Sequence, residues 1–160
     1  MARATPGTRD VWVIHGPNLN LLGRREPKIY GHDTLAKIDA RLAALGEELG
    51  LRVSSFQSNH EGALIDRLQI AMEEADAVVL NGGALTHTSM ALGDTVRAMS
   101  IPVVEVHLSN LYARERQRQT SLTAPATAGV VMGFGPVGYE LALRAIHDRL
   151  RADRKRGGRS

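Results

Sequence analysis

Hydrophobic residues along this chain form two kinds of segment, which alternate. Short continuous runs rich in Val and Ile predict buried strands, at residues 11–14, 53–56, 77–80, 103–106 and 129–134. Between them, apolar residues recur every three or four positions, which predicts helices over 33–49, from about 61, over 89–99 and over 137–150, with a short one at 111–118. Asp33 or Thr34 suits the start of the first helix, and Gly50 suits its end.

This alternation predicts a single α/β domain over residues 11–150. The strands are apolar throughout rather than at every second position, as expected of a parallel sheet that helices cover on both faces. Five such strands fit the flavodoxin-like, doubly wound arrangement, in which ligands bind beyond the carboxyl ends of the strands. Residues 1–10 and 151–160 lie outside the pattern, and we expect both to be disordered tails.

Charge is unevenly distributed along the 160 residues. The formal net charge is +3, yet residues 10–150 hold 13 basic and 16 acidic residues, so the basic excess lies in the tails. The C-terminal tail could touch RNA or an anionic surface, but a solvated end is the simpler interpretation, and we expect neither a nucleic-acid nor a membrane partner. The chain has no Cys, no apolar stretch of membrane-spanning length and no apolar leader, which favours a cytoplasmic protein without disulfides.

Polar residues follow the ends of four predicted strands. They supply amides, imidazoles and hydroxyls within segments 15–23, 57–62, 81–89 and 105–110. Because the carboxyl ends of parallel strands meet at one edge of a sheet, we expect these groups to converge on one site.

Several chemistries find no support at this edge. The chain has no phosphate-binding loop, no dinucleotide fingerprint after its first strand and no nucleophile elbow. No lysine lies at a predicted strand end, where a Schiff-base lysine would be expected. His60, His87 and His107 could hold a metal, but they lack the close pairing that metal sites commonly show, so we expect no catalytic metal.

Acid–base chemistry remains, and segment 23–31 is the most informative part of the chain for it. Glycines bound this segment on both sides, which suits a lid that opens and closes. The segment also places several cations, among them Arg25, close to Tyr30. Because a nearby guanidinium favours the phenolate form of a tyrosine, Tyr30 is a candidate base.

Five motifs closely resemble those of the type II 3-dehydroquinate dehydratases: GPNLNLLGRREPKIYG, FQSNHEG, LNGGALTHTS, VEVHLSN and ARERQR. They occur in the family's order and span nearly all of residues 11–150. The resemblance implies anti elimination of water from 3-dehydroquinate through an enolate, without cofactor or metal. This step serves either the shikimate pathway toward aromatic amino acids or the catabolism of quinate. The resemblance also implies a homo-oligomer in which trimers assemble into a dodecamer.

The same resemblance implies roles for individual residues. Tyr30 would remove the C2 proton of the substrate, and Arg25 would favour its phenolate form and stabilise the transition state. His107 would protonate the departing C1 hydroxyl, and Glu105 would orient His107. Asn18 would hold a water that stabilises the enolate oxygen. The substrate's hydroxyls and carboxylate would be bound by Asn81, His87, Leu108, Ser109 and Arg118, with Asp94 reaching in from a neighbouring subunit.

The chain departs from the family pattern at four positions, none of them catalytic: Gln69, Gly93, Gln117 and Gln119. These departures bear on subunit packing and on the loop that binds the substrate carboxylate. Two alternatives exist on the same fold. A flavin- or nucleotide-binding module is disfavoured because bulky leucines fill the first loop, where a phosphate would need small hydroxylated residues. A non-catalytic interaction protein is disfavoured because the set of catalytic residues is intact.

Overall fold

The computed structural model describes residues 7–24, 27–30 and 32–157. Its strands are β1 (Arg9–His15), β2 (Leu51–Gln57), β3 (Ala77–Asn81), β4 (Val103–His107) and β5 (Gly129–Met132). They form one parallel sheet in the order β2-β1-β3-β4-β5. This is a flavodoxin-like order, so the predicted fold class is confirmed.

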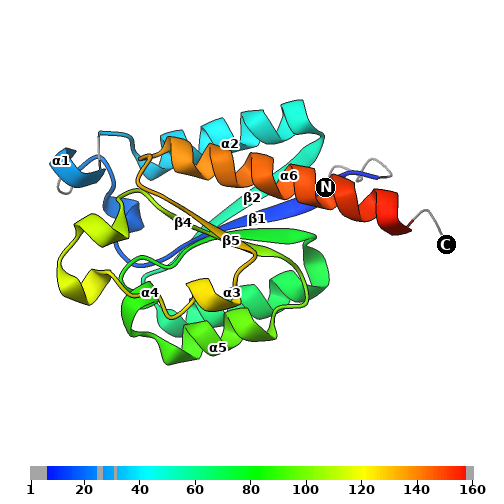
Figure 1. Cartoon of the computed structure of the whole chain (residues 1–160). Coiled ribbons are helices and arrows are strands. Elements are labelled where there is room, and N and C mark those ends of the chain that lie inside the picture. The colour runs from blue at the N-terminus through cyan, green and yellow to red at the C-terminus, as the bar shows by residue number, and fades with distance from the viewer. Residues whose placement is uncertain (1–6, 25–26, 31, 158–160) are drawn as a thin grey trace.

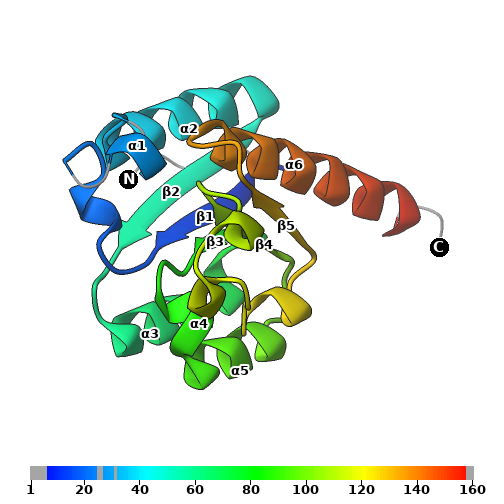
Figure 2. The same cartoon turned by 60° about the vertical axis from the view of Figure 1, so that its left-hand side comes forward.

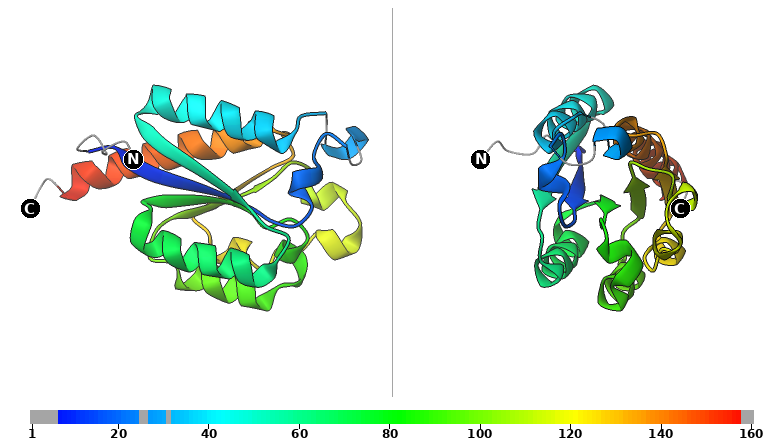
Figure 3. Two further views of the ribbon diagram at one scale, coloured as in Figure 1. Left: turned by 180° about the vertical axis from the view of Figure 1, so that it is seen from behind. Right: turned by 90° about the vertical axis from the view of Figure 1, so that its left-hand side faces the viewer.

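Long helices cover both faces of the sheet (Figures 1 and 3). One face carries α2 (Leu35–Leu49) and α6 (Val137–Gly157), and the other carries α3 (Glu61–Glu74) and α5 (Met90–Ala98). The shorter elements are α1 (Pro27–Tyr30), α4 (Leu85–Thr88) and the 3-10 turns η1 (Leu19–Leu21), η2 (Leu111–Ala113), η3 (Arg116–Arg118) and η4 (Ala124–Ala126). No helix in the described part of the chain combines the length and hydrophobicity that crossing a lipid bilayer requires.

The core has two halves, one on each face of the sheet. Side chains alternate along β1, so that Val11 and Val13 pack toward α2 and α6, whereas Trp12 and Ile14 pack toward α3 and α5. Strands β3 and β4 are buried along their whole length, as their continuous apolar runs predict. Strand β5 is partly exposed, because it lies at the edge of the sheet with a paired strand on one side only.

Local signals define the ends of the helices. The Thr34 side chain caps α2 by accepting a hydrogen bond from the Lys37 amide at 3.3 Å, and Gly50 ends this helix in the left-handed conformation, with φ of 69°. Ser89 caps α5 and accepts a hydrogen bond from a backbone amide in the first turn at 2.8 Å. The helix expected at 111–118 is instead two separate 3-10 turns, η2 and η3.

The two segments that we expected to be disordered tails, 1–10 and 151–160, both include residues that belong to the folded domain. Helix α6 continues to Gly157, so a disordered tail from residue 151 was wrong for the part of it that the structure describes. This extension has no apolar stripe to reveal it, but its Arg, Lys and Ala residues are good helix formers. Strand β1 begins at Arg9, inside the tail expected at 1–10. Asp76 holds this start in place, because its carboxylate accepts a hydrogen bond from the Asp10 amide at 2.7 Å.

The loops that follow β1 and β3 run directly against each other. Gly16 donates its backbone N–H to the Asn81 carbonyl at 2.7 Å. A Cβ atom at Gly16 would lie 2.4 Å from the carbonyl oxygen of Gly82, so a larger residue would push the loops apart. The contact lies at the point where the chain order in the sheet reverses, which is where doubly wound folds bind ligands.

Candidate active site

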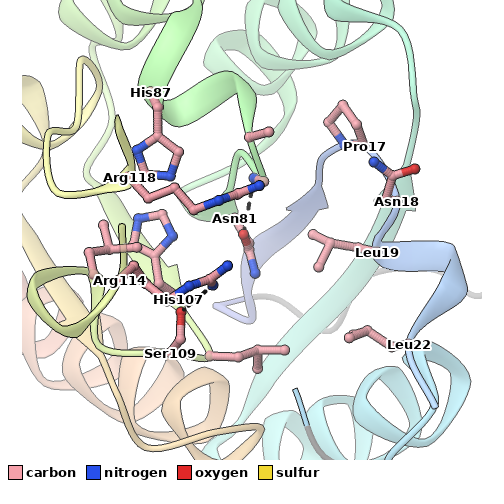
Figure 4. A pocket seen from close by; sticks show the side chains of 14 residues that line it. Pro17, Asn18, Leu19, Leu22, Asn81, His87, His107, Ser109, Arg114 and Arg118 are labelled. Carbon is pink, nitrogen blue, oxygen red and sulfur yellow. Dashed lines mark hydrogen bonds between the residues drawn. The ribbon is translucent and has the colours of Figure 1, made fainter. Parts of the chain in front are cut away.

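A pocket opens at the carboxyl ends of β1, β3 and β4, the end of the sheet that Figure 2 brings forward. Figure 4 shows Asn18 and Leu19 on one side of it and His87 and Arg118 on the other, with Asn81 between them. The polar side chains that line the pocket are Asn18, Asn81, His87, His107, Ser109, Arg114 and Arg118. The polar strand ends therefore converge as predicted.

A buried hydrogen bond between a carboxylate and an imidazole lies at the base of the pocket. Glu105 and His107 are two residues apart on β4 and so share one face of the strand. The Nε2 atom of His107 lies 2.6 Å from the Glu105 carboxylate, which is fully buried. Burial alone would raise the pKa of Glu105, but hydrogen bonds from His107, Thr123 and Ser121 outweigh it and hold that pKa below its usual value. The carboxylate is therefore ionised at neutral pH and fixes the tautomer and orientation of the His107 ring.

His87 lies beside His107 and is held from a different element. Its Nδ1–H donates to the carbonyl of Thr120 at 2.7 Å, and this hydrogen bond sets the orientation of the ring. The two imidazoles stack, with ring centroids 6.3 Å apart and an angle of 26° between their planes. The pocket therefore contains two imidazoles whose orientations are set by acceptors outside it.

Two arginines from the segment after β4 complete this side of the pocket. Arg118 donates from Nε to Glu115 at 2.6 Å. Arg114 donates to the hydroxyl of Ser109 at 3.2 Å. Gln119 anchors the segment by donating to the Arg114 carbonyl at 2.8 Å. Planar guanidinium groups held in this way suit a bidentate contact with a carboxylate.

The opposite side of the pocket is the loop after β1. Asn18 adopts the left-handed backbone conformation, with φ of 67°, which is uncommon outside glycine. Asn59 supports it, because its side-chain oxygen accepts a hydrogen bond from the Asn18 amide at 2.9 Å. The side-chain amide of Gln57 ties the same loop to β2 by donating to the carbonyl of Gly16 at 3.2 Å. The apolar and backbone surface of the pocket comes from Pro17, Leu19, Leu22, Gly83, Ala84, Leu108 and Leu111.

Most of the residues predicted for the site lie together. The pocket-lining residues include Asn18, Asn81, His87, His107, Leu108, Ser109 and Arg118, and Glu105 supports His107 from behind. Asp94 does not join them, because it lies on the exposed face of α5, paired with Arg97 at 2.7 Å. Arg25 and the side chain of Tyr30 lie outside the described residues.

Among the described residues, Arg114 is the one charged group of the pocket that the sequence predictions missed. It lies in the ARERQR motif, four positions before Arg118, so the motif itself contained the signal. No group of three His, Asp or Glu side chains that could hold a metal is present among residues 7–24, 27–30 and 32–157. None of the three lysines lines the pocket.

The unusual glycine at position 93 has a structural explanation. A Cβ atom there would lie 2.7 Å from the carbonyl oxygen of Leu122, so α5 can approach segment 121–123 closely only without a side chain. This segment supplies Ser121 and Thr123, the two hydroxyl donors to Glu105. Gln117, another departure from the family pattern, is exposed and does not line the pocket.

Comparisons with known proteins agree with this geometry. The chain matches the family described as dehydroquinase class II over residues 9–147. The 3-dehydroquinate dehydratase of Thermus thermophilus is 58% identical over 141 residues, 88% of this chain and 95% of that protein. That of Rhizobium johnstonii is 55% identical over 139 residues, 87% of this chain and 96% of the relative. The crystal structure of type II dehydroquinase from Propionibacterium acnes has a TM-score of 0.86 and 38% identity, covering 88% and 97% of the two chains. With most of its length matched, this chain belongs to the class II dehydroquinase family.

Proposed function

We propose that this chain dehydrates 3-dehydroquinate to 3-dehydroshikimate by anti elimination of water through an enolate. The observation that carries the proposal is the buried Glu105–His107 pair, which adjoins a pocket holding two guanidinium groups. This arrangement supplies an acid for a leaving hydroxyl and cations for a carboxylate. Relatives at 55% and 58% identity are named for the same reaction, and family membership leaves the flavin alternative without support.

His107 is the proposed general acid, which protonates the C1 hydroxyl as it leaves. Because Nε2 is engaged by Glu105, Nδ1 is the ring nitrogen that remains for proton transfer. Imidazole suits this task because its unperturbed pKa lies near neutrality. Glu105 acts through His107 and is a positioning residue.

The remaining polar groups are proposed to hold the substrate. Arg118, together with Ser109 and the Leu108 backbone, would bind the carboxylate, and Arg114 adds a second cation beside them. Asn81 and His87 would bind ring hydroxyls. Asn18 would hold a water beside the enolate oxygen, a role for which its constrained backbone is suited.

Tyr30 is the proposed base and Arg25 the cation that favours its phenolate form. Both roles rest on the motif resemblance and on the chemistry, since the groups concerned lie outside the described residues. The backbone of α1, which includes Tyr30, lies at the same end of the molecule as the pocket (Figure 1). A base from this lid-like segment would complete a site whose described residues supply an acid but no strong base.

A direct assay tests the proposed reaction. Adding 3-dehydroquinate to the purified protein is expected to produce the absorbance of a conjugated enone, because elimination places a C=C bond beside the ketone. Borohydride added with substrate is expected to leave activity intact, because none of the three lysines lines the pocket to form an imine. Absence of the enone product would refute the proposed activity. A lysine adduct seen by mass spectrometry would instead refute the enolate mechanism.

We further propose that the enzyme is a cytoplasmic homo-oligomer, in which trimers build a dodecamer. Asp94 is exposed on α5 and does not line the pocket described above, so the substrate-binding role that the resemblance implies for it requires a neighbouring subunit. Closed symmetric assembly would bring it to a neighbouring subunit.

Replacing Asp94 by Ala is therefore expected to lower activity without unfolding the chain. Arg97→Ala is the matched control, because it breaks the same ion pair but keeps the carboxylate. Steady-state kinetics and circular dichroism would measure the two effects. An active wild-type monomer in light scattering at assay concentration, or full activity of Asp94→Ala, would exclude the proposed role.

A further inference from the structure

Behind the pocket, four polar side chains form a continuous hydrogen-bonded row. Asn81 Nδ2 lies 3.0 Å from the hydroxyl oxygen of Tyr139, and that oxygen lies 2.9 Å from Nδ1 of His15. The row ends at Asp39, whose carboxylate lies 2.9 Å from Nε2 of His15. The four residues come from β3, α6, β1 and α2, so the row ties four elements together.

The sheet register explains why one hydroxyl can join two strands. His15 and Asn81 are paired residues at the carboxyl ends of β1 and β3. Neighbouring parallel strands place such residues side by side on one face of the sheet. Tyr139 projects from α6, which packs on that face, and its oxygen bonds to both side chains. His15 and Tyr139 are fully buried, whereas the Asp39 side chain is 31% exposed.

The row has a single donor direction. A side-chain NH₂ group can only donate, so Asn81 donates to the Tyr139 oxygen. An ionised carboxylate can only accept, so Asp39 receives the Nε2–H of His15. In the tautomer that carries its hydrogen on Nε2, Nδ1 of His15 is an acceptor and receives the hydroxyl hydrogen of Tyr139. Hydrogen bonds aligned in one direction polarise and strengthen one another.

Burial keeps the Tyr139 hydroxyl protonated, as this direction of hydrogen bonding requires. Desolvation raises the pKa of the Tyr139 hydroxyl, the hydrogen bond from Asn81 acts against that shift, and the negative charge of Asp39 adds to it. The phenol therefore stays protonated at neutral pH, and it can accept from Asn81 while it donates to His15.

The side-chain amide of Asn81 is consequently held through both its oxygen and its nitrogen. Its oxygen accepts a hydrogen bond from the Gly83 amide at 3.1 Å, and one of its two N–H groups is taken by Tyr139. We propose that Asp39, His15 and Tyr139 are positioning residues that keep the second N–H of Asn81 available to the substrate. The inference rests on the proposed role of Asn81 in substrate binding. An amide turned by 180° would present an oxygen instead, and so would reject a group that needs a donor.

The decisive variant is Tyr139→Phe, which keeps the ring and deletes only the hydroxyl. Asn81 then loses its fixed partner and can turn away from the substrate, so KM for 3-dehydroquinate is expected to rise about tenfold, the effect of losing roughly one net hydrogen bond. The value of kcat is expected to stay within about threefold of wild type, because the acid His107 is untouched. Ile146→Val is the matched control, since it also weakens a fully buried position of α6, and an aliphatic side chain takes no part in the hydrogen bonds of the row. It should lower the unfolding midpoint without changing KM.

A second pair of variants tests the row from its exposed end. Asn in place of Asp39 can donate as well as accept, so it no longer imposes one direction on His15, and Ala removes the acceptor altogether. A rise in KM that grows from Asp39→Asn to Asp39→Ala, with kcat nearly constant, would support the inference. This arm remains decisive should Tyr139→Phe fail to fold, since Asp39 is partly exposed.

Three outcomes separate this inference from the proposed function. An unchanged KM in Tyr139→Phe, or in both Asp39 variants, would overturn the positioning role even if stability fell. An unchanged KM in Asn81→Ala would instead remove the proposed substrate contact, and the inference with it. A wild-type protein without enone-forming activity would refute the activity itself.

Discussion

Replacing Tyr30 by Phe is expected to remove nearly all turnover while substrate binding stays measurable. A proton next to a ketone must be taken by a base stronger than water, and a tyrosine phenolate, favoured by a guanidinium, would meet that requirement. Phe keeps the ring but lacks the oxygen that accepts the proton. The loss should appear mainly in kcat, as for an interaction used in the transition state, and deletion of a general base typically costs about 10²–10⁴-fold.

Steady-state kinetics on matched Tyr→Phe variants would test this expectation. Tyr112→Phe is the control, because Tyr112 is exposed and does not line the pocket, and it should keep wild-type turnover. If Tyr30→Phe retained more than about a tenth of wild-type kcat, less loss than the weak end of the range for a general base, Tyr30 would not be the base. The role would then pass to His87 or to a bound water, and segment 23–31 would serve only as a cover.

The strands and the position of the site could be predicted because their signals are local. Runs such as 77–80 and 103–106 are short, apolar throughout and rich in β-branched residues, and this combination marks strands that are buried on both faces. Parallel strands must then end at a common edge, so the polar residues that follow them had to meet. His107 and Asn81 lie at such ends, and each lines the pocket.

Most of what the sequence pattern missed depends on contacts between distant segments. The buried row pairs His15 with Tyr139, 124 residues later, and neither has a neighbour in sequence that signals the contact. Gly93 departs from the family pattern, and only the Leu122 carbonyl packed against it explains why. The last turns of α6 carry no apolar stripe, so periodicity could not distinguish them from a tail. In the first two cases the cause is tertiary packing, which a local pattern does not report.

The other large effect is expected at His107. Gln can still donate a hydrogen bond to Glu105, so His107→Gln should preserve the buried contact that now measures 2.6 Å. A carboxamide cannot deliver a proton to the leaving hydroxyl, and loss of a general acid typically costs about 10²–10⁴-fold in turnover. Because Gln keeps a donor beside those of Ser121 and Thr123 for the buried carboxylate, the loss should come with little change in the unfolding midpoint. Steady-state kinetics and thermal unfolding of the same preparation would measure both.

Two further variants complete the test of His107: Glu105→Gln examines its positioning residue, and His147→Gln is the control. A carboxamide at position 105 would no longer carry the charge that fixes the His107 tautomer, so Glu105→Gln should reduce kcat by less than His107→Gln does, as expected of a positioning residue. His147 lies on α6 among the residues of a different cavity, and His147→Gln should leave turnover unchanged. Substantial turnover in His107→Gln with normal folding would exclude His107 as the acid. A loss in Glu105→Gln that exceeds the loss in His107→Gln would show instead that the carboxylate takes a direct part in the proton transfer.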